Sequence, residues 1–213
     1  MYVTTMEILY LPPDQLQYIE YIKELAERNK IHIWLGGSFL RGNATAFSDV
    51  DISVYCDVAN LSEIIYAYGS PVYISYTSNP AGILIIIYED GVAVDLEIVD
   101  KIEVKDDEFF HLKYIKKFKF TRDETICKKL ALRNDEPYQV SRLFHRSLIK
   151  YLSEKKDVGI SIANEIAAYL NSEEYIDEEN YKDRFDHILR IFNDQYKLDE
   201  GYYNLLLNLA NHL

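Results

Sequence analysis

The sequence predicts an α+β protein, in which a mixed sheet flanked by helices is followed by an all-helical C-terminal bundle. Short apolar runs with a period of two alternate with helical patterns in the first half, whereas the second half shows helical periods alone. The composition also changes near residues 105–120, from an acidic segment to a basic one. We therefore predict two domains, 1–110 and 111–213.

The size and composition are those of an ordinary globular chain. Its 213 residues, 48% hydrophobic and 27% charged, are enough to build a buried core. The longest apolar run, Ile83–Tyr88, has six residues, against the roughly 20 that a membrane-spanning helix needs. Cys56 and Cys127 match no metal-ligand or redox spacing and suit a reducing compartment. With no signal peptide recognised at the N-terminus, we expect a cytoplasmic protein without a membrane partner.

Apolar periodicity predicts the elements of the first half. A helix begins near Pro12-Pro13-Asp14, and Leu16, Ile19, Ile22 and Leu25 recur at every third position to form its apolar face. Asp90-Gly91 is a strong hairpin turn signal between two apolar runs. The strands that we expect are 31–35, 49–56, 72–76, 82–89 and 92–99, with a short helix at 61–68.

The second half contains helical patterns. Asp135-Glu136-Pro137 has an acid and a proline where a helix starts. Four apolar residues at helical spacing follow, namely Val140, Phe144, Leu148 and Tyr151. Further helices are expected at 160–170, 181–192 and 203–209.

A glycine-rich turn follows the strand at 31–35. Gly36 and Gly37 allow the backbone to approach a ligand closely, and a turn into a helix presents free N–H groups to an anion. Ser38 adds a hydroxyl, and Arg41 adds a positive charge one turn later. Glycine turns are common, so this pattern indicates a phosphate site only in combination with other features.

Three carboxylates supply that combination. Asp49 and Asp51 are two residues apart on a predicted strand and therefore project from the same face. Asp95 lies, with Glu97, on the polar face of a later strand, and the two strands need only be neighbours for a three-carboxylate cluster to form. Adjacent acids repel unless a cation lies between them, and oxygen ligands select hard cations such as Mg²⁺. Such a cluster can hold two metal ions, which activate an attacking hydroxyl and neutralise the pyrophosphate that leaves a nucleoside triphosphate.

The order Gly36-Gly37-Ser38, Asp49-Val50-Asp51-Ile52 and Asp95 resembles the signature of the nucleotidyltransferase superfamily typified by DNA polymerase β. The resemblance covers roughly residues 30–100, and its details are similar to the minimal and antibiotic-type nucleotidyltransferases. It implies a polymerase β-like fold for the first domain.

The resemblance also implies a role for each matching residue. Asp49 and Asp51 would ligate the Mg²⁺ or Mn²⁺ ions, and Asp95 would complete a metal site and act as general base toward the acceptor. Gly37 and Ser38, after Gly36, would hold the β- and γ-phosphates, with Arg41 as an additional phosphate contact outside the core signature. Glu97 is expected to be a neighbour of these ligands.

These observations predict a metal-dependent enzyme that moves a nucleoside monophosphate from an NTP, with ATP expected, to a hydroxyl of a small molecule or protein. Pyrophosphate would be released. One alternative is a toxin–antitoxin type nucleotidyltransferase that acts on tRNA or on a partner protein. Another is a nucleotide-binding module that has lost turnover. The sequence leaves the acceptor open.

The charge distribution bears on the partners. The net charge of −12 argues against a protein that coats nucleic acid, yet residues 111–156 carry 13 basic and 5 acidic side chains. This segment is either a solvated helical surface or a surface that faces a polyanion. Its basic residues include Lys113, Lys116, Lys117 and Lys119 and a stripe formed by Arg142, Arg146 and Lys150. The apolar helix at 203–209 suits a homodimer interface.

Overall fold

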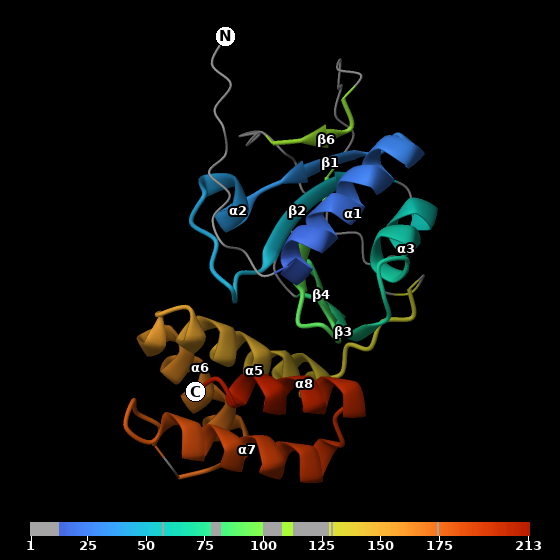
Figure 1. Cartoon of the computed structure of the whole chain (residues 1–213). Helices are drawn as coiled ribbons and strands as arrows, with labels where there is room; N and C mark the ends of the chain where they lie inside the picture. The colour runs from blue at the N-terminus through green and yellow to red at the C-terminus, as the bar shows by residue number, and fades with distance from the viewer. Residues whose placement is uncertain are drawn as a thin grey trace. The chain divides into compact units, whose positions relative to one another are not determined.

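The computed structural model describes residues 13–56, 58–77, 82–99, 108–112, 128, 130–173 and 175–213. The chain divides into two compact units, Met1–Leu132 and Arg133–Leu213. In Figure 1 the second unit is the helical part coloured from yellow to red.

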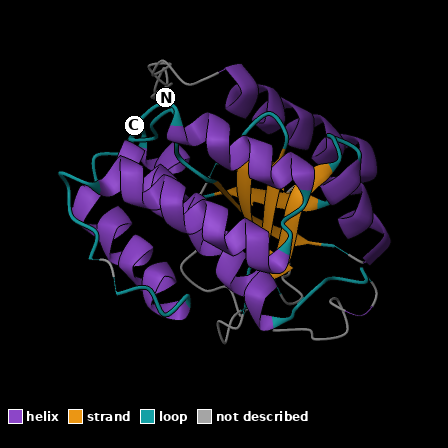
Figure 2. Ribbon diagram, turned by 90° about the horizontal axis from the view of Figure 1, so that it is seen from below, coloured by secondary structure: helices purple, strands orange, loops and turns teal. Residues whose placement is uncertain are grey.

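The first unit is built on a six-stranded mixed sheet with the strand order β3-β4-β5-β2-β1-β6. The pairs β2–β5 and β1–β6 are parallel and the other pairs are antiparallel. The strands appear in orange in Figure 2. They are β1 His32–Leu35, β2 Val50–Tyr55, β3 Pro71–Tyr76, β4 Leu84–Tyr88, β5 Ala93–Ile98 and β6 Phe110–His111. The α+β class predicted from the sequence is confirmed.

Two helices cover one face of the sheet and form the core with it. Helices α1 Pro13–Asn29 and α3 Val58–Tyr66 share one hydrophobic cluster with alternate residues of β2, β4 and β5. In β2 the buried residues are Val50, Ile52 and Val54, whereas the residues between them are only half-buried. The period of two therefore separates a covered apolar face from a polar face, as the alternation in the sequence predicts.

The buried face of α1 differs from the predicted one. Leu16 and Ile19 are only half-buried, because steps of three residues drift by about 60° each around a helix of 3.6 residues per turn. The residues that are buried are Gln15, Tyr18, Ile22, Leu25 and Ala26.

The hairpin predicted around Asp90-Gly91 is present between β4 and β5. Asp90 Oδ1 accepts a hydrogen bond of 3.0 Å from the Val92 N–H, and Gly91 adopts a φ of 90°. A side chain that closes the turn and a residue that tolerates positive φ explain why this dipeptide reverses the chain.

The second unit is a bundle of helices that pack against one another. Its helices are α5 Glu136–Leu152, α6 Lys156–Tyr169, α7 Tyr181–Tyr196 and α8 Glu200–Ala210. Contacts join α5 to α6, α6 to α7, α7 to α8 and α8 back to α5, which closes the bundle. The predicted start of α5 is confirmed, since Asp135 caps the helix by accepting a hydrogen bond of 3.2 Å from the Tyr138 N–H.

The sheet continues past residue 110, because β6 pairs with β1 through Ile33–Phe110 and Trp34–His111. The units divide after Leu132, later than the domain boundary predicted after residue 110. That boundary rested on composition, which reports surface charge and not strand pairing. The lysines predicted as a basic surface at 113–119 lie outside the described residues. In the part of the chain that is described, no helix has the length and apolarity to cross a membrane.

Gly159 in α6 provides a test of the bundle packing. A Cβ at this position would lie 2.8 Å from the Ser147 carbonyl oxygen and 2.8 Å from Tyr151 Cβ, both in α5. The same contact contains a buried hydrogen bond of 2.7 Å from Ser147 Oγ to the Gly159 carbonyl. We expect Gly159→Ala to lower the free energy of unfolding by about 1–3 kcal/mol, as overpacking does.

Urea titration measures this change, and Ser161→Ala at an exposed position of the same helix is the control. The control should remain within about 0.5 kcal/mol of the wild type. A Gly159→Ala protein as stable as the wild type would show that α5 and α6 do not approach this closely.

Candidate active site

The polar face of the sheet brings Asp51 and Asp95 together. Strands β2 and β5 run parallel, and Asp51 and Asp95 are direct partners in their register. Partners in adjacent strands share a face, with the strands about 4.8 Å apart. Both side chains are half-buried, on the face opposite the one that α1 and α3 cover. The strand pairing on which the predicted carboxylate cluster depends is therefore present.

The Gly36-Gly37 turn packs directly against Asp51. The Gly36 N–H donates a hydrogen bond of 2.8 Å to the Asp51 carbonyl oxygen. Gly37 has a φ of +58°, and a Cβ added there would overlap with the Asp51 carboxylate. Glycine is thus required at position 37 for its backbone conformation and for the space that Asp51 occupies. The sequence prediction assigned this close approach to a ligand, whereas the structure shows it to a carboxylate of the chain itself.

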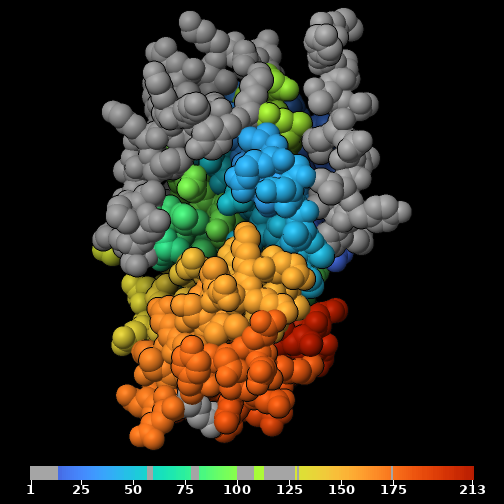
Figure 3. Space-filling view, turned by 90° about the vertical axis from the view of Figure 1, so that its left-hand side faces the viewer, coloured from blue at the N-terminus to red at the C-terminus, as the bar shows by residue number. Residues whose placement is uncertain are grey.

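The other predicted phosphate contacts lie on the short helix that follows the turn. Helix α2, Gly37–Arg41, carries Ser38 at a half-buried position and Arg41 at an exposed position in its last turn. The light-blue surface of α2 and the following loop is visible in Figure 3. The phosphate roles of Ser38 and Arg41 stay predictions.

Asp49 lies in the loop that leads into β2. It is half-buried and lies one residue before β2, which begins at Val50. A tight turn precedes it, in which the Thr45 N–H donates a hydrogen bond of 2.8 Å to Ser48 Oγ. Gln15 of α1 also reaches this loop, where its Nε2 donates a hydrogen bond of 2.6 Å to the Ser48 carbonyl oxygen.

Sequence reasoning did not identify Gln15 as relevant to the site. The sequence feature that could have identified it is a polar residue three positions before Tyr18, on the face of α1 that the structure shows to be buried. The predicted apolar face of α1 did not include that position, so the signal was missed.

Glu97 extends the negative charge along the same face. It is the direct partner of Ser53, whose hydroxyl donates a hydrogen bond of 3.3 Å to Glu97 Oε2. Burial raises the pKa of Glu97, the nearby charge of Asp51 raises it further, and the Ser53 hydrogen bond lowers it. The negative charges of Asp51 and Glu97 therefore lie close enough to repel each other.

The donor chemistry fits a divalent cation. Carboxylate oxygens are the ligands that Mg²⁺ and Mn²⁺ prefer, and Asp51 and Asp95 present them from one register position. A cation there would neutralise the charge that raises the pKa of Glu97. Across the described ranges, no group of three or more His, Cys, Asp or Glu side chains is arranged to hold a metal ion. The participation of Asp49 as a third ligand therefore stays a prediction.

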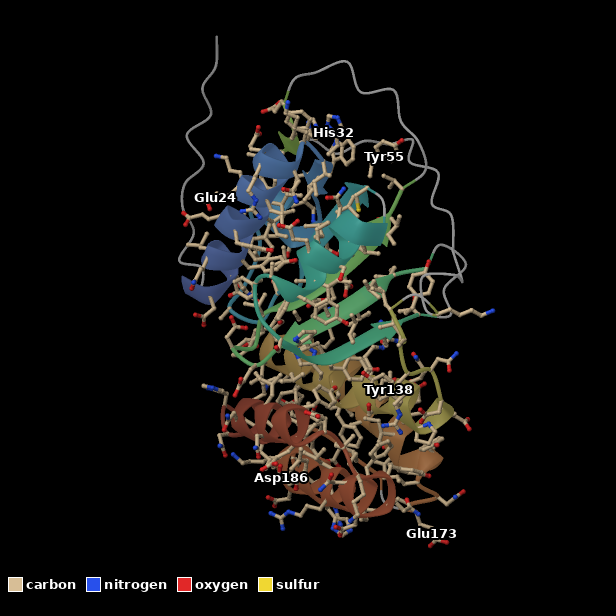
Figure 4. The ribbon with its side chains drawn as sticks, turned by 90° about the vertical axis from the view of Figure 1, so that its right-hand side faces the viewer. Glu24, His32, Tyr55, Tyr138, Glu173 and Asp186 are labelled. Carbon is tan, nitrogen blue, oxygen red and sulfur yellow. The ribbon has the colours of Figure 1, made fainter. Side chains whose placement is uncertain are left out.

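An aromatic cluster occupies the same face toward the sheet edge formed by β6. The Trp34 and His111 rings are buried and stack with centroids 4.8 Å apart. His32 Nδ1 lies 3.0 Å from His111 Nε2, in a hydrogen bond that joins β1 to β6. His32 pairs in turn with Tyr55, and Figure 4 shows these two labelled residues at one end of the sheet. These contacts fix β1, the strand from which the glycine turn leaves.

The predicted basic stripe lies on α5, in the second unit. Arg146 is exposed, whereas Arg142 and Lys150 are half-buried. His145, between them, is buried. The stripe is thus a feature of the bundle, and its proposed contact with a polyanion stays a prediction.

A substitution at Gly37 tests the contact with Asp51. Gly37→Ala introduces both backbone strain and an overlap with the carboxylate, whereas Gly42→Ala introduces strain alone. Gly42 has a φ of +70°, and an added Cβ there meets no atom of the described residues within 4 Å. We expect urea titration to show a loss of stability at least about 1 kcal/mol larger for Gly37→Ala than for Gly42→Ala. Equal losses would contradict the packing of Asp51 against the turn.

The raised pKa of Glu97 predicts a pH-dependent effect on stability. A carboxyl with a higher pKa in the folded chain binds more protons there than in the unfolded chain. The free energy of unfolding therefore falls as the pH rises from the usual value of 4.5 through the folded-state pKa.

Glu97→Gln removes the titrating group. The free energy of unfolding of this variant, relative to that of the wild type, should therefore increase from pH 4.5 to the folded-state pKa of Glu97 and then level off. Urea titrations in EDTA between about pH 4 and pH 8 measure the difference. Glu89→Gln, at an exposed position beyond β4, is the control and should show no such trend. A difference that is constant with pH would contradict the raised pKa.

Comparison with known families agrees with this geometry. The family model described as "Nucleotidyltransferase domain" matches residues 17–134. The matched range includes the glycine turn, α2, Asp49 and both strands that carry Asp51 and Asp95. No curated protein matches the sequence. Since the family model covers more than half of the 213 residues, the chain belongs to the nucleotidyltransferase domain family.

Proposed function

We propose that the protein is a metal-dependent nucleotidyltransferase, which moves a nucleoside monophosphate from an NTP to an acceptor hydroxyl and releases pyrophosphate. ATP is the expected nucleotide, and the acceptor is a hydroxyl of a small molecule or a protein. The observation that carries this proposal is the pairing of Asp51 with Asp95 beside the Gly36-Gly37 turn, within a nucleotidyltransferase domain.

Asp51 and Asp95, together with Asp49, would hold the divalent cation. When bound, Mg²⁺ or Mn²⁺ would supply positive charge that offsets the charge of the phosphates. Gly37 and Ser38 would bind the phosphates through backbone N–H and hydroxyl groups, and Arg41 would add a positive charge.

Asp95 would accept the proton of the acceptor hydroxyl. The acceptor oxygen then forms a bond to the α-phosphorus, while the bond from that phosphorus to the bridging oxygen of pyrophosphate breaks. The proton remains on the Asp95 carboxylate until solvent removes it, and pyrophosphate carries away the negative charge of the leaving group.

The fixed carboxylates favour turnover over a binding module without activity. Two half-buried acids side by side cost stability unless a cation compensates them. A module that has lost turnover commonly loses at least one of its carboxylates, whereas Asp51 and Asp95 are both present here. The toxin–antitoxin alternative depends on the basic segment 111–156, most of whose first half lies outside the described residues. The cytoplasmic location and the homodimer through 203–209 likewise remain predictions from the sequence.

A pyrophosphate-release assay tests the proposal. It uses each of the four NTPs with Mg²⁺ or Mn²⁺ and a mixed pool of hydroxyl acceptors. We expect metal-dependent release that falls at least about 100-fold in Asp51→Asn and Asp95→Asn, because each removes a charge used directly in the reaction. Glu89→Gln, which changes an exposed carboxylate, should retain wild-type activity.

Release that survives both Asp substitutions would contradict the assigned site. NTP binding measured by calorimetry, without release under any of these conditions, would instead support the binding module.

A further inference from the structure

Gln15 is a polar side chain that the fold buries. It lies near the start of α1, with 5% of its surface exposed. Its Nε2 donates hydrogen bonds to two main-chain carbonyl oxygens of the loop before β2, at 2.6 Å to Ser48 and 3.3 Å to Ala46. These partners are 33 and 31 residues away in the sequence. The side chain thus connects the first helix to the loop that ends at Asp49.

The chemistry of the contact fixes the orientation of the Gln15 amide. Carbonyl oxygens only accept hydrogen bonds, so the NH₂ group and not Oε1 must face Ser48 and Ala46. Oε1 is buried and has no donor within the described residues. An amide buried in this way is less favourable than an apolar side chain of the same size unless its donors are needed. The two hydrogen bonds to the loop therefore explain why an amide side chain is present at this buried position.

The stronger of these bonds acts on the peptide unit of Asp49. The Ser48 carbonyl and the Asp49 N–H belong to one planar peptide group, so holding the oxygen also orients the nitrogen. The β2 ladder begins at Val50 and fixes Asp51, but it does not include Asp49. The Thr45–Ser48 turn closes the loop on itself, and Gln15 attaches that turn to α1.

We propose that Gln15 is a positioning residue for nucleotidyl transfer, which orients the Ser48–Asp49 peptide so that Asp49 joins Asp51 and Asp95 in binding the divalent cation. This inference rests on the proposed function. Asp51 lies in the β2 ladder and packs against the glycine turn, whereas the Ser48–Asp49 peptide is attached to α1 through Gln15. Loss of the Gln15 hydrogen bonds would leave the fold in place and loosen one metal ligand.

Two variants and a matched control test this role. Gln15→Met keeps the length of the side chain without donors, and Gln15→Glu keeps its shape but places oxygen where the NH₂ group stands. The control is Tyr21→Phe on the same helix, which removes a hydrogen bond of 3.2 Å from Tyr21 Oη to the Glu63 carbonyl oxygen, far from Asp49 in the sequence. Thermal unfolding establishes that all three fold, and the control provides the effect of losing one bond from α1 to the main chain.

Three readouts separate positioning from stability. Amide hydrogen exchange follows residues 45–49 in the absence of metal, and electron paramagnetic resonance measures the affinity for Mn²⁺ in the presence of ATP. Pyrophosphate release as a function of Mg²⁺ concentration gives the metal requirement and kcat separately. We expect both Gln15 variants to exchange faster at 45–49, to bind Mn²⁺ about 10-fold or more weakly, and to need correspondingly more Mg²⁺. Tyr21→Phe should resemble the wild type in all three.

Gln15 variants whose exchange at 45–49 and Mn²⁺ affinity match those of Tyr21→Phe would overturn the inference, even with reduced activity. A wild-type protein that releases no pyrophosphate would contradict the proposed function. In that case the exchange at 45–49 still decides whether Gln15 holds the loop, because it requires neither metal nor turnover.

Discussion

The parallel pairing of β2 with β5 is the constraint on which the candidate site depends. Its register places Asp51 beside Asp95, and a shift by one residue would send one of them to the face covered by α1 and α3. The apolar partners on that covered face, Val50 with Val94 and Ile52 with Leu96, hold the register. Burial of the core thus stabilises an arrangement of like charges that would otherwise be unfavourable.

The three acids are held by different parts of the chain. Asp51 is fixed by the sheet and by the glycine turn, which leaves room for its carboxylate only because position 37 has no side chain. Asp95 is fixed by the hairpin of β4 and β5. Asp49 lies outside the ladder, and its loop is attached to α1. The first helix therefore contributes to the core through its apolar residues and to the site through Gln15.

Much of this architecture was predictable from local patterns. Apolar periodicity located most of the strands and helices, and the order of the glycines and acids resembles the signature of the nucleotidyltransferase superfamily. The sequence predicted a carboxylate cluster only on the condition that the strands of Asp51 and Asp95 are neighbours. Their pairing could not be predicted, because parallel pairing joins segments far apart in the sequence. Gln15 was not predictable, since its role follows from two long-range hydrogen bonds that no periodicity reports. The extension of the sheet to β6 was not predictable either, because a strand of two residues is too short to show a periodic pattern.

The central claim is that Asp51 and Asp95 together bind the divalent cation of a nucleotide substrate. The most direct test is a crystal structure with Mn²⁺ and a non-hydrolysable ATP analogue, in which anomalous scattering locates the metal. The account predicts a Mn²⁺ peak in contact with oxygens of both carboxylates and of the triphosphate, next to the Gly36-Gly37 turn. A metal–nucleotide complex bound without contact to either carboxylate would contradict it.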